Sequence, residues 1–489
     1  MTSSSLAHSA ARGALFTFVA QAAKILLQLL SVVVLSRMLT PHDYGLLAIV
    51  LVVVGIGELF RDFGLTSASI QAPVLTDGQR DNLFWVNTGI GLILAVTMFF
   101  LAGPIEILTG EAQIAGVIRA LAALFLLNGL ATQHRANLSR DLKFRSLAVI
   151  DITAAGIALL VAIIAAFLGA NYWALVAQQL TSSVIILAGV TIAGHWFPRR
   201  YSRQYSIREL LNFGWNIVAT NLLVYAGSQI DTILVGLKFG TTSLGLYNRA
   251  YQLVMTPLGQ VRSPMKGVAL PVLSRVQQDR GRFDSYVTSA QLMLGYSLGI
   301  PLALVTALAG PIVKIMLGPR WLAAAPILSL FSIAGLLTTI AFVGYWVYLS
   351  RGLGRSLFFY TIVTTAIKIL CIIIGSFFGV VGVAIGFVIA PALSWPLSLF
   401  WLSRVTPMPT AKLYAGAGRI LLATACVGLV AWEASQFVIS VGPWAMLAVG
   451  VAAGLVTAAV ALFLPVYRRD SRNLVAFVRL MFKRSPSTA

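Results

Sequence analysis

Long apolar runs separated by short polar segments make up most of this chain. Each run has roughly the 20 residues that an α-helix needs to cross ~30 Å of hydrocarbon. Strands of a membrane β-barrel would instead alternate apolar and polar positions. We therefore predict an all-α membrane protein with about fourteen transmembrane helices, at residues 14–36, 42–63, 82–103, 114–136, 147–168, 172–194, 212–237, 243–273, 285–310, 322–349, 357–377, 380–402, 415–438 and 443–466.

Three of the predicted helices carry polar stripes at a spacing of ~100° per residue. The residues that share a face are Thr17, Gln21, Lys24, Gln28 and Ser31 on the first helix, Asn221, Tyr225, Ser228 and Thr232 on the seventh, and Arg249, Gln252, Thr256, Gln260 and Ser263 on the eighth. An ionisable side chain at the bilayer centre costs ~2.5–3.5 kcal/mol and needs a cavity or a partner. Stripes that contain Lys24 or Arg249 favour a water-filled cavity. Polar contacts between packed helices are the alternative interpretation.

Positive charge inside the predicted helices indicates an anionic substrate. Besides Lys24 and Arg249, Lys368 lies at the centre of the eleventh span and Arg119 in the outer third of the fourth. Arginine binds phosphate in a bidentate manner, and lysine supplies a point charge. We therefore predict that these four cations line a substrate cavity. A pump for cationic drugs would be expected to line its cavity with carboxylates.

Carboxylates inside the spans are few, and two of them, Glu58 and Asp231, are candidates for coupling or gating. Glu58 lies one turn before Arg61, which can pair with it, and Glu58 is also a candidate for binding a coupling proton or sodium ion. Asp231 and Arg249 lie at matching depth on either side of the outer turn between the seventh and eighth spans. An ion pair between them would serve either as a structural clamp or in gating.

The chain contains an internal repeat. LSRDLKFRSL at 138–147 recurs as LSRGLGRSL at 349–357 with one gap. Phe167 and Gly169 recur 210 residues later, and Gly45-Leu46 recurs 200 residues later as Gly245-Leu246. Each repeat holds six spans, and an even number of spans gives both repeats the same orientation.

This repeat predicts the domain organisation. We expect two six-helix bundles related by a pseudo-two-fold axis along the membrane normal, with alternating access to a cavity between them. The predicted parts are an N-terminal bundle at 1–195, a C-terminal bundle at 208–404, two additional transmembrane helices at 413–466 and a cytoplasmic tail at 467–489. The tail reads as a basic amphipathic helix on the anionic inner leaflet, with a disordered basic tail as the alternative.

The net charge of +20 follows the membrane topology. Only 10% of the residues are charged, against about 25% in a soluble domain. With the N-terminus inside, most of the 35 lysines and arginines fall in cytoplasmic loops and span ends, as expected for cytoplasmic segments. We therefore expect a multi-pass protein with both termini in the cytoplasm, surrounded by membrane lipids and without a nucleic-acid partner.

Other chemistry is not indicated by the sequence. The predicted outer loops are too short to hold the acceptor and the catalytic carboxylates of a membrane glycosyltransferase, so we expect no enzyme and no catalytic residues. The four histidines lack metal-ligand spacing, and the two cysteines fall inside apolar runs. The sequence therefore predicts no metal site and no cofactor.

Several segments together resemble one family. The segments are VLSRMLTPHDYGLLA (34–48), GLTSASIQ (64–71), LFWVNTGIG (83–91), YWALVAQQL (172–180), GLYNRAYQLVMTPLGQV (245–261) and LPVLSRVQQD (270–279). They resemble the polysaccharide flippases of the MATE-like MOP superfamily, with exporters of the colanic-acid type as the most similar members. The resemblance runs through roughly residues 10–405.

The resemblance implies both a fold and a function. The fold would be two six-helix bundles with two extra helices. The function would be translocation of undecaprenyl-diphosphate-linked oligosaccharide repeat units across the bacterial inner membrane for exopolysaccharide or lipopolysaccharide biosynthesis. Lys24 and Arg249 occupy spans whose cations are thought to engage the carrier diphosphate in such flippases. A multidrug antiporter of the same superfamily is the alternative.

Overall fold

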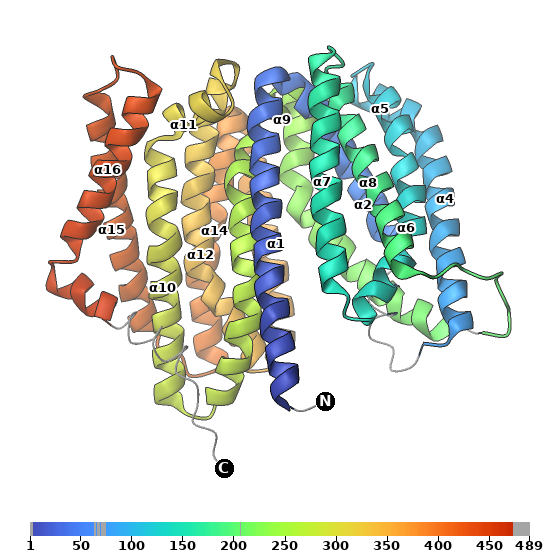
Figure 1. Cartoon of the computed structure of the whole chain (residues 1–489). Helices are drawn as coiled ribbons and strands as arrows, with labels where there is room; N and C mark the ends of the chain where they lie inside the picture. The colour runs from blue at the N-terminus through green and yellow to red at the C-terminus, as the bar shows by residue number, and fades with distance from the viewer. Residues whose placement is uncertain (1–2, 63–64, 66–68, 70–74, 206, 473–489) are drawn as a thin grey trace. The chain divides into compact units, whose positions relative to one another are not determined.

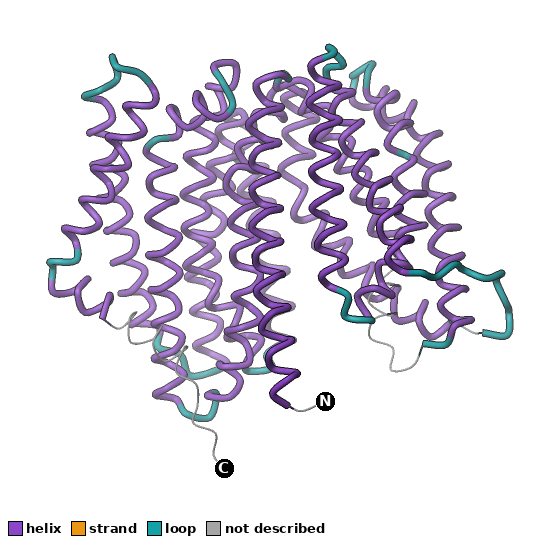
Figure 2. The backbone as a smooth tube through the Cα atoms, in the orientation of Figure 1, coloured by secondary structure: helices purple, strands orange, loops and turns teal. Residues whose placement is uncertain are grey.

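The computed structural model describes residues 3–62, 65, 69, 75–205 and 207–472 (Figure 1). Within these ranges the chain is helical, with short connections at the helix ends and no strand (Figure 2). Eleven segments of the described chain are long and apolar enough to cross a membrane, as judged by length and composition. The predicted all-α class is confirmed.

The chain forms two compact units, Met1–Asn248 and Arg249–Ala489. The first contains α1 (Ser3–Met38), α2 (Pro41–Asp62), α4 (Asp77–Thr109), α5 (Ile114–Leu121), α6 (Ala123–Arg140), α7 (Phe144–Phe167), α8 (Tyr172–Gly194) and the beginning of α9 (Arg208–Val276). The second contains the rest of α9, then α10 (Arg280–Ala307), α11 (Ala309–Met316), η1 (Pro319–Ala324), α12 (Ala325–Ser350), α13 (Gly354–Gly375), η2 (Ser376–Phe378), α14 (Gly379–Val405), α15 (Thr410–Gln436) and α16 (Pro443–Ala461).

The predicted spans lie on helices of the described chain, and several of their boundaries differ in detail. The fourth span comprises α5 and α6, which meet at Ala122. The seventh and eighth spans both lie within α9, where Gly240 has φ 77° and ψ 175°. Glycine reaches this non-helical conformation without a Cβ clash, so α9 is divided where the outer turn is predicted.

The internal repeat is visible in the turns of each unit. Leu142 has φ 56° and Gly352, 210 residues later, has φ 68°. Both turns close with the same backbone bond, from Lys143 N–H to the Leu138 carbonyl at 2.9 Å and from Leu353 N–H to the Tyr348 carbonyl at 2.8 Å. The gap that we placed between the two recurring segments is therefore wrong, because the turns match at a constant offset.

A second recurrence joins α2 to α9 within the first unit. The carbonyl oxygen of Thr241 occupies the place where a Cβ on Gly45 would lie, and the carbonyl oxygen of Pro41 does the same for Gly245. The two contacts are equivalent, because Pro41 and Gly45 lie 200 residues before Thr241 and Gly245. The recurring Gly-Leu pair has the same offset. Small residues let helix backbones approach closely, so these glycines set the crossing. The predicted domain limits and the axis between the bundles stay predictions.

Packing in the first unit places α6 among its neighbours. Ala131, Leu138, Leu147, Ile150 and Val190 form an apolar cluster that joins α6, α7 and α8. On another side, the backbone of α4 packs closely against α6, because a Cβ at Gly129 would lie 2.8 Å from the carbonyl oxygen of Asn87. These contacts orient α6, whose remaining face carries the polar residues described below.

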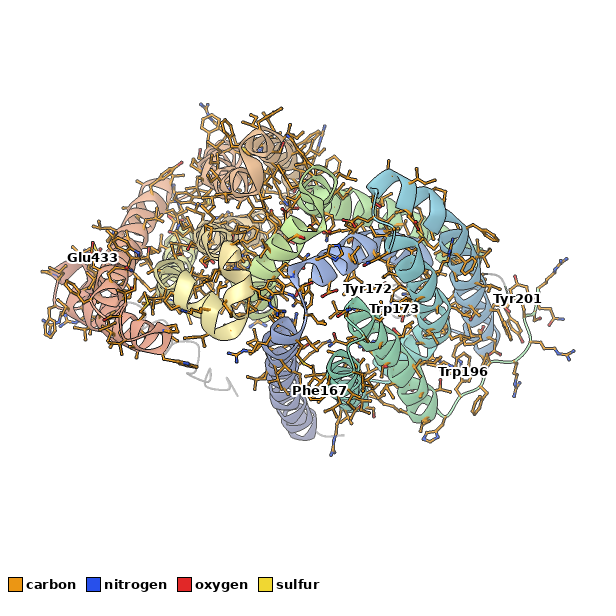
Figure 3. All side chains as sticks on the ribbon, turned by 90° about the horizontal axis from the view of Figure 1, so that it is seen from above. Phe167, Tyr172, Trp173, Trp196, Tyr201 and Glu433 are labelled. Carbon is orange, nitrogen blue, oxygen red and sulfur yellow. The ribbon has the colours of Figure 1, made fainter. Side chains whose placement is uncertain are left out.

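The connection between α8 and α9 is held against α4 by hydrogen bonds and a cation–π contact. The Asn82 side-chain amide donates to the carbonyls of Ser202 at 2.7 Å and Tyr205 at 2.8 Å. The Arg80 guanidinium lies 4.6 Å from the centre of the Trp196 ring, and Tyr201 points away from the helices (Figure 3). The described part of this connection, residues 195–205, therefore packs against α4.

The chain after α16 is held to the second unit by a buried carboxylate. Residues 465–472 are helical, and Asp470 is 4% exposed. Asp470 accepts from Arg419 at 2.8 and 3.2 Å and from the Tyr296 hydroxyl at 3.0 Å. The rest of the predicted amphipathic tail, 473–489, lies outside the described residues, so that prediction stays open.

Candidate functional site

One face of α6 carries Asn128, Thr132 and Arg135. At 100° per residue and a rise of 1.5 Å, these side chains lie within about 60° of arc and ~10 Å of helix length. Each of them contacts a charged residue of a neighbouring helix in the first unit. We call the set the α6 seam; its residues are Lys24, Glu58, Arg61, Asn128, Thr132, Arg135 and Asp151.

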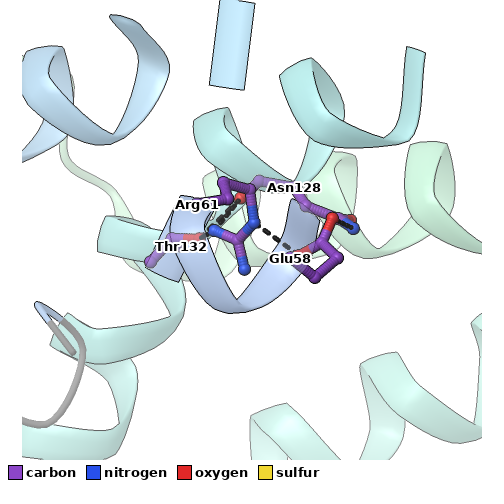
Figure 4. A network of polar contacts seen from close by, with 4 residues as sticks. All are labelled: Glu58, Arg61, Asn128 and Thr132. Carbon is purple, nitrogen blue, oxygen red and sulfur yellow. Dashed lines mark hydrogen bonds and ion pairs between the residues drawn. The ribbon is translucent and has the colours of Figure 1, made fainter. Parts of the chain in front are cut away.

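The first part of the seam joins α2 to α6 (Figure 4). Arg61 Nε donates to Glu58 Oε2 at 2.5 Å, so the expected pair is present. Asn128 Nδ2 donates to the other carboxylate oxygen, Oε1, at 2.8 Å. Arg61 also donates through Nη1 to the Thr132 hydroxyl. Both oxygens of Glu58 are therefore engaged by protein donors.

The second part of the seam joins α6, α7 and α1 through Asp151. Arg135 donates from Nη1 and Nη2 to the two oxygens of Asp151, both at 2.8 Å. Lys24 Nζ lies 3.8 Å from Asp151 Oδ2, the oxygen that Arg135 Nη2 also contacts. One carboxylate thus faces two cations from two other helices.

The charges of the seam do not balance. Lys24, Arg61 and Arg135 supply three positive charges, while Glu58 and Asp151 supply two negative ones. The side chains of Lys24 and Arg135 are 48% and 40% exposed, against 19% for Asp151. Charged groups within a membrane-spanning segment face water or protein. The exposed parts of the two cations are therefore not directed at hydrocarbon.

The depth of this cluster follows from helix geometry. At 1.5 Å per residue, Lys24 lies about 21 Å along α1 from Met38, and Asp151 about 24 Å along α7 from Phe167. Both of these helix ends are predicted to face outward. The Lys24–Asp151–Arg135 cluster therefore belongs to the predicted cytoplasmic half of the bilayer.

The polar stripe of α1 serves more than one purpose. The Gln178 side chain on α8 donates to the Ser31 hydroxyl at 2.9 Å, which is a polar contact between packed helices. Gln21 and Gln28 are half-buried, whereas Lys24 is exposed in the first unit. The Ser31 contact is of the kind that the alternative interpretation predicts, while Lys24, Gln21 and Gln28 stay predictions as substrate contacts.

The polar residues of α9 have partners of their own. The Tyr225 hydroxyl donates to the Val52 carbonyl at 3.3 Å, and the Tyr247 hydroxyl donates to Asp231 at 2.8 Å. Arg249 donates to Gln252 at 2.8 Å, one turn further along the same face. The predicted Asp231–Arg249 pair and the substrate role of Asn221 stay predictions.

The two other predicted cations lie beside aromatic rings. The Arg119 guanidinium carbon is 5.7 Å from the centre of Phe99, and Lys368 Nζ is 4.9 Å from that of Phe387. These are cation–π distances. In the second unit, Arg262 donates to the Gly335 carbonyl at 2.7 Å and to Thr338 at 3.1 Å. Arg119 and Lys368 stay predictions as substrate contacts.

The sequence interpretation missed four residues of the seam, namely Asn128, Thr132, Arg135 and Asp151. Asp151 lies inside the fifth span and contacts Lys24, and the sequence interpretation did not consider it. Arg135 was assigned to a cytoplasmic span end. The spacing of Asn128, Thr132 and Arg135 at i, i+4 and i+7 is the signal that could have found this face. No group of three or more candidate metal ligands occurs among the described residues.

The apolar helices and their internal charged seam define a multi-pass membrane protein. The family model described as "Polysaccharide biosynthesis protein" matches residues 34–326, which is more than half of the chain. The chain belongs to this family.

Two relatives extend the comparison. The lipopolysaccharide biosynthesis protein WzxC of Escherichia coli (strain K12) is 24% identical over 404 residues, 81% of each chain. The succinoglycan biosynthesis transport protein ExoT of Rhizobium meliloti (strain 1021) is 25% identical over 331 residues, 67% of this chain and 66% of its own. Both names concern the biosynthesis of polysaccharides.

Solved structures identify the fold. The lipid II flippase MurJ in an inward closed conformation matches with a TM-score of 0.68 and 16% identity, covering 92% of this chain and 98% of MurJ. An inward-facing multidrug resistance MATE transporter of the MOP superfamily matches with a TM-score of 0.61 and 16% identity, covering 80% of this chain and 96% of that one. The predicted MATE-like fold is confirmed.

Proposed function

We propose that this protein is a flippase that moves undecaprenyl-diphosphate-linked oligosaccharide repeat units across the bacterial inner membrane. Translocation would proceed by alternating access and would serve exopolysaccharide or lipopolysaccharide biosynthesis. The family, the biosynthetic relatives and the fold shared with a lipid II flippase support this proposal. The relatives are transport and biosynthesis proteins by name, so we infer a transporter and not an enzyme.

The observation that carries the proposal is the excess cation of the α6 seam. Lys24 and Arg135 share the single carboxylate of Asp151 and expose much of their side chains, so one positive charge is not balanced within the seam. A diphosphate can accept a bidentate arginine contact and a lysine contact at once. We infer that Lys24 and Arg135 bind the carrier diphosphate, with Arg249, Lys368 and Arg119 as further candidates.

A lysine variant tests this role in cells that depend on the protein for polymer export. We expect Lys24→Ala to lower export at least tenfold and to leave lipid-linked repeat units on the cytoplasmic side, because the anion loses a charged contact. Lys24→Arg should retain most export. Immunoblotting of membranes and quantification of polymer and of lipid-linked intermediates supply the readouts.

Lys314→Ala is the matched control, because Lys314 is exposed and lies outside the seam. Normal export by Lys24→Ala at normal membrane levels would contradict the role of Lys24. If the multidrug alternative held, the wild-type protein would export ethidium and confer resistance to it. We expect neither, because the seam carries excess positive charge.

A further inference from the structure

We propose that Asp151 is an exchangeable counter-ion: it holds Lys24 and Arg135 in the substrate-free protein, and the anionic headgroup of the substrate replaces it on both cations. This inference rests on the proposed function and adds a positioning residue to it. Asp151 would not contact the substrate. It would determine how firmly the substrate binds and whether α1 keeps its charged link to α7.

The geometry of the Arg135–Asp151 contact suits such an exchange. Two parallel hydrogen bonds of 2.8 Å use the planar fork of the guanidinium. A phosphate group accepts the same fork with two of its oxygens. Asp151 thus occupies on Arg135 the position that a phosphate would take.

The contact with Lys24 is looser. At 3.8 Å from Oδ2, the ammonium group is beyond hydrogen-bond distance, and it shares that oxygen with Arg135. Nearly half of the Lys24 side chain is exposed, whereas the Asp151 side chain is mostly buried. An incoming anion can therefore contact the exposed cations before it displaces the mostly buried carboxylate of Asp151.

Exchange changes the links between helices. The carboxylate of Asp151 on α7 links α1, through Lys24, to α6, through Arg135. When a diphosphate binds both Lys24 and Arg135, the charged link between α1 and α7 is lost. The hydrogen bond between Ser31 of α1 and Gln178 of α8 remains. Binding of the substrate would thereby replace the charged link between α1 and α7 by a link between α1 and α6 through the diphosphate, and breaking the Asp151 contacts would reduce the affinity.

The isosteric variant Asp151→Asn separates affinity from turnover. This variant removes the negative charge that competes with the substrate for Lys24 and Arg135. We therefore expect the Kd of the purified full-length protein for undecaprenyl diphosphate to fall about tenfold. Translocation in liposomes should be at least tenfold slower, because the substrate is not displaced by the carboxylate. Asp151→Glu should restore much of the turnover.

Asp141→Asn is the control, since Asp141 forms a comparable 3.8 Å ion pair with Lys143 in an exposed turn. It should change neither quantity. Weaker binding by Asp151→Asn, or unchanged binding and turnover, would overturn the exchange. If the wild-type protein neither bound nor translocated the probe, the proposed function itself would fail, which is a different outcome.

A measurement on the wild-type protein avoids any folding defect of the variants. We expect carbodiimide labelling of Asp151, quantified by peptide mass spectrometry, to increase at least threefold when undecaprenyl diphosphate is added. Undecaprenol, which lacks the phosphates, should leave the labelling unchanged. Equal labelling with and without the diphosphate would show that Asp151 keeps its two cations and would overturn the proposal.

Discussion

Glu58 illustrates how side-chain contacts discriminate between roles of a single residue. The sequence leaves open whether it binds a coupling ion. In the structure, Arg61 and Asn128 donate to its two oxygens, and Arg61 also reaches Thr132. A carboxylate that already binds an arginine and an amide has less capacity for a coupling cation. These contacts favour a structural role in joining α2 to α6.

Glu58→Gln tests that role. A glutamine can still accept from one donor, so we expect transport within about twofold of wild type and a small decrease in the melting temperature of the purified protein. Glu58→Leu should be worse, because removing one partner of a partly buried pair costs up to ~3–5 kcal/mol. Loss of transport by a stable Glu58→Gln protein would instead indicate a coupling role.

At the scale of helices, the crossing of α2 and α9 makes a specific prediction. Gly45→Ala places a methyl group where the Thr241 carbonyl lies, so the helices must separate. Overpacking of this kind costs ~1–3 kcal/mol, and we expect a lower melting temperature and reduced transport.

Gly156→Ala on α7 is the matched control for this crossing. Nothing lies within 4 Å of the position of its Cβ, so alanine should be neutral or slightly stabilising there. Thermal unfolding of the two variants in the same detergent makes the comparison. Equal melting temperatures would show that the close approach of α2 and α9 contributes little.

The helices themselves could be predicted from the sequence, whereas the seam could only be predicted in part. A run such as 147–168 is apolar enough to predict its own helix. The Arg135–Asp151 contact depends on how α6 and α7 are rotated against each other, and the pattern within one helix does not give that rotation. Lys24 was found because it stands alone in an apolar run. Asp151 lies near a charged span end and was overlooked there.

At the scale of the whole molecule, the topology is the property on which the function depends. The charge distribution predicts both termini inside, the α8–α9 connection inside and the α4–α5 connection outside. In a protein whose Cys371 and Cys426 are replaced by serine, Ala112→Cys should react with a membrane-impermeant maleimide in intact spheroplasts. Arg203→Cys should react with the maleimide only after the membrane has been made permeable. The reverse labelling pattern would show that the protein has the opposite orientation in the membrane and would contradict the proposed direction of transport.

The central claim is that the protein moves a diphosphate-linked oligosaccharide lipid across a bilayer. The most direct test is reconstitution of the purified full-length protein into liposomes that contain a fluorescent undecaprenyl-diphosphate oligosaccharide in one leaflet. We predict protein-dependent appearance of the lipid in the other leaflet, reduced at least tenfold in Lys24→Ala and retained in Lys314→Ala. Translocation no faster than in protein-free liposomes, by a protein shown to be folded and inserted, would contradict the account.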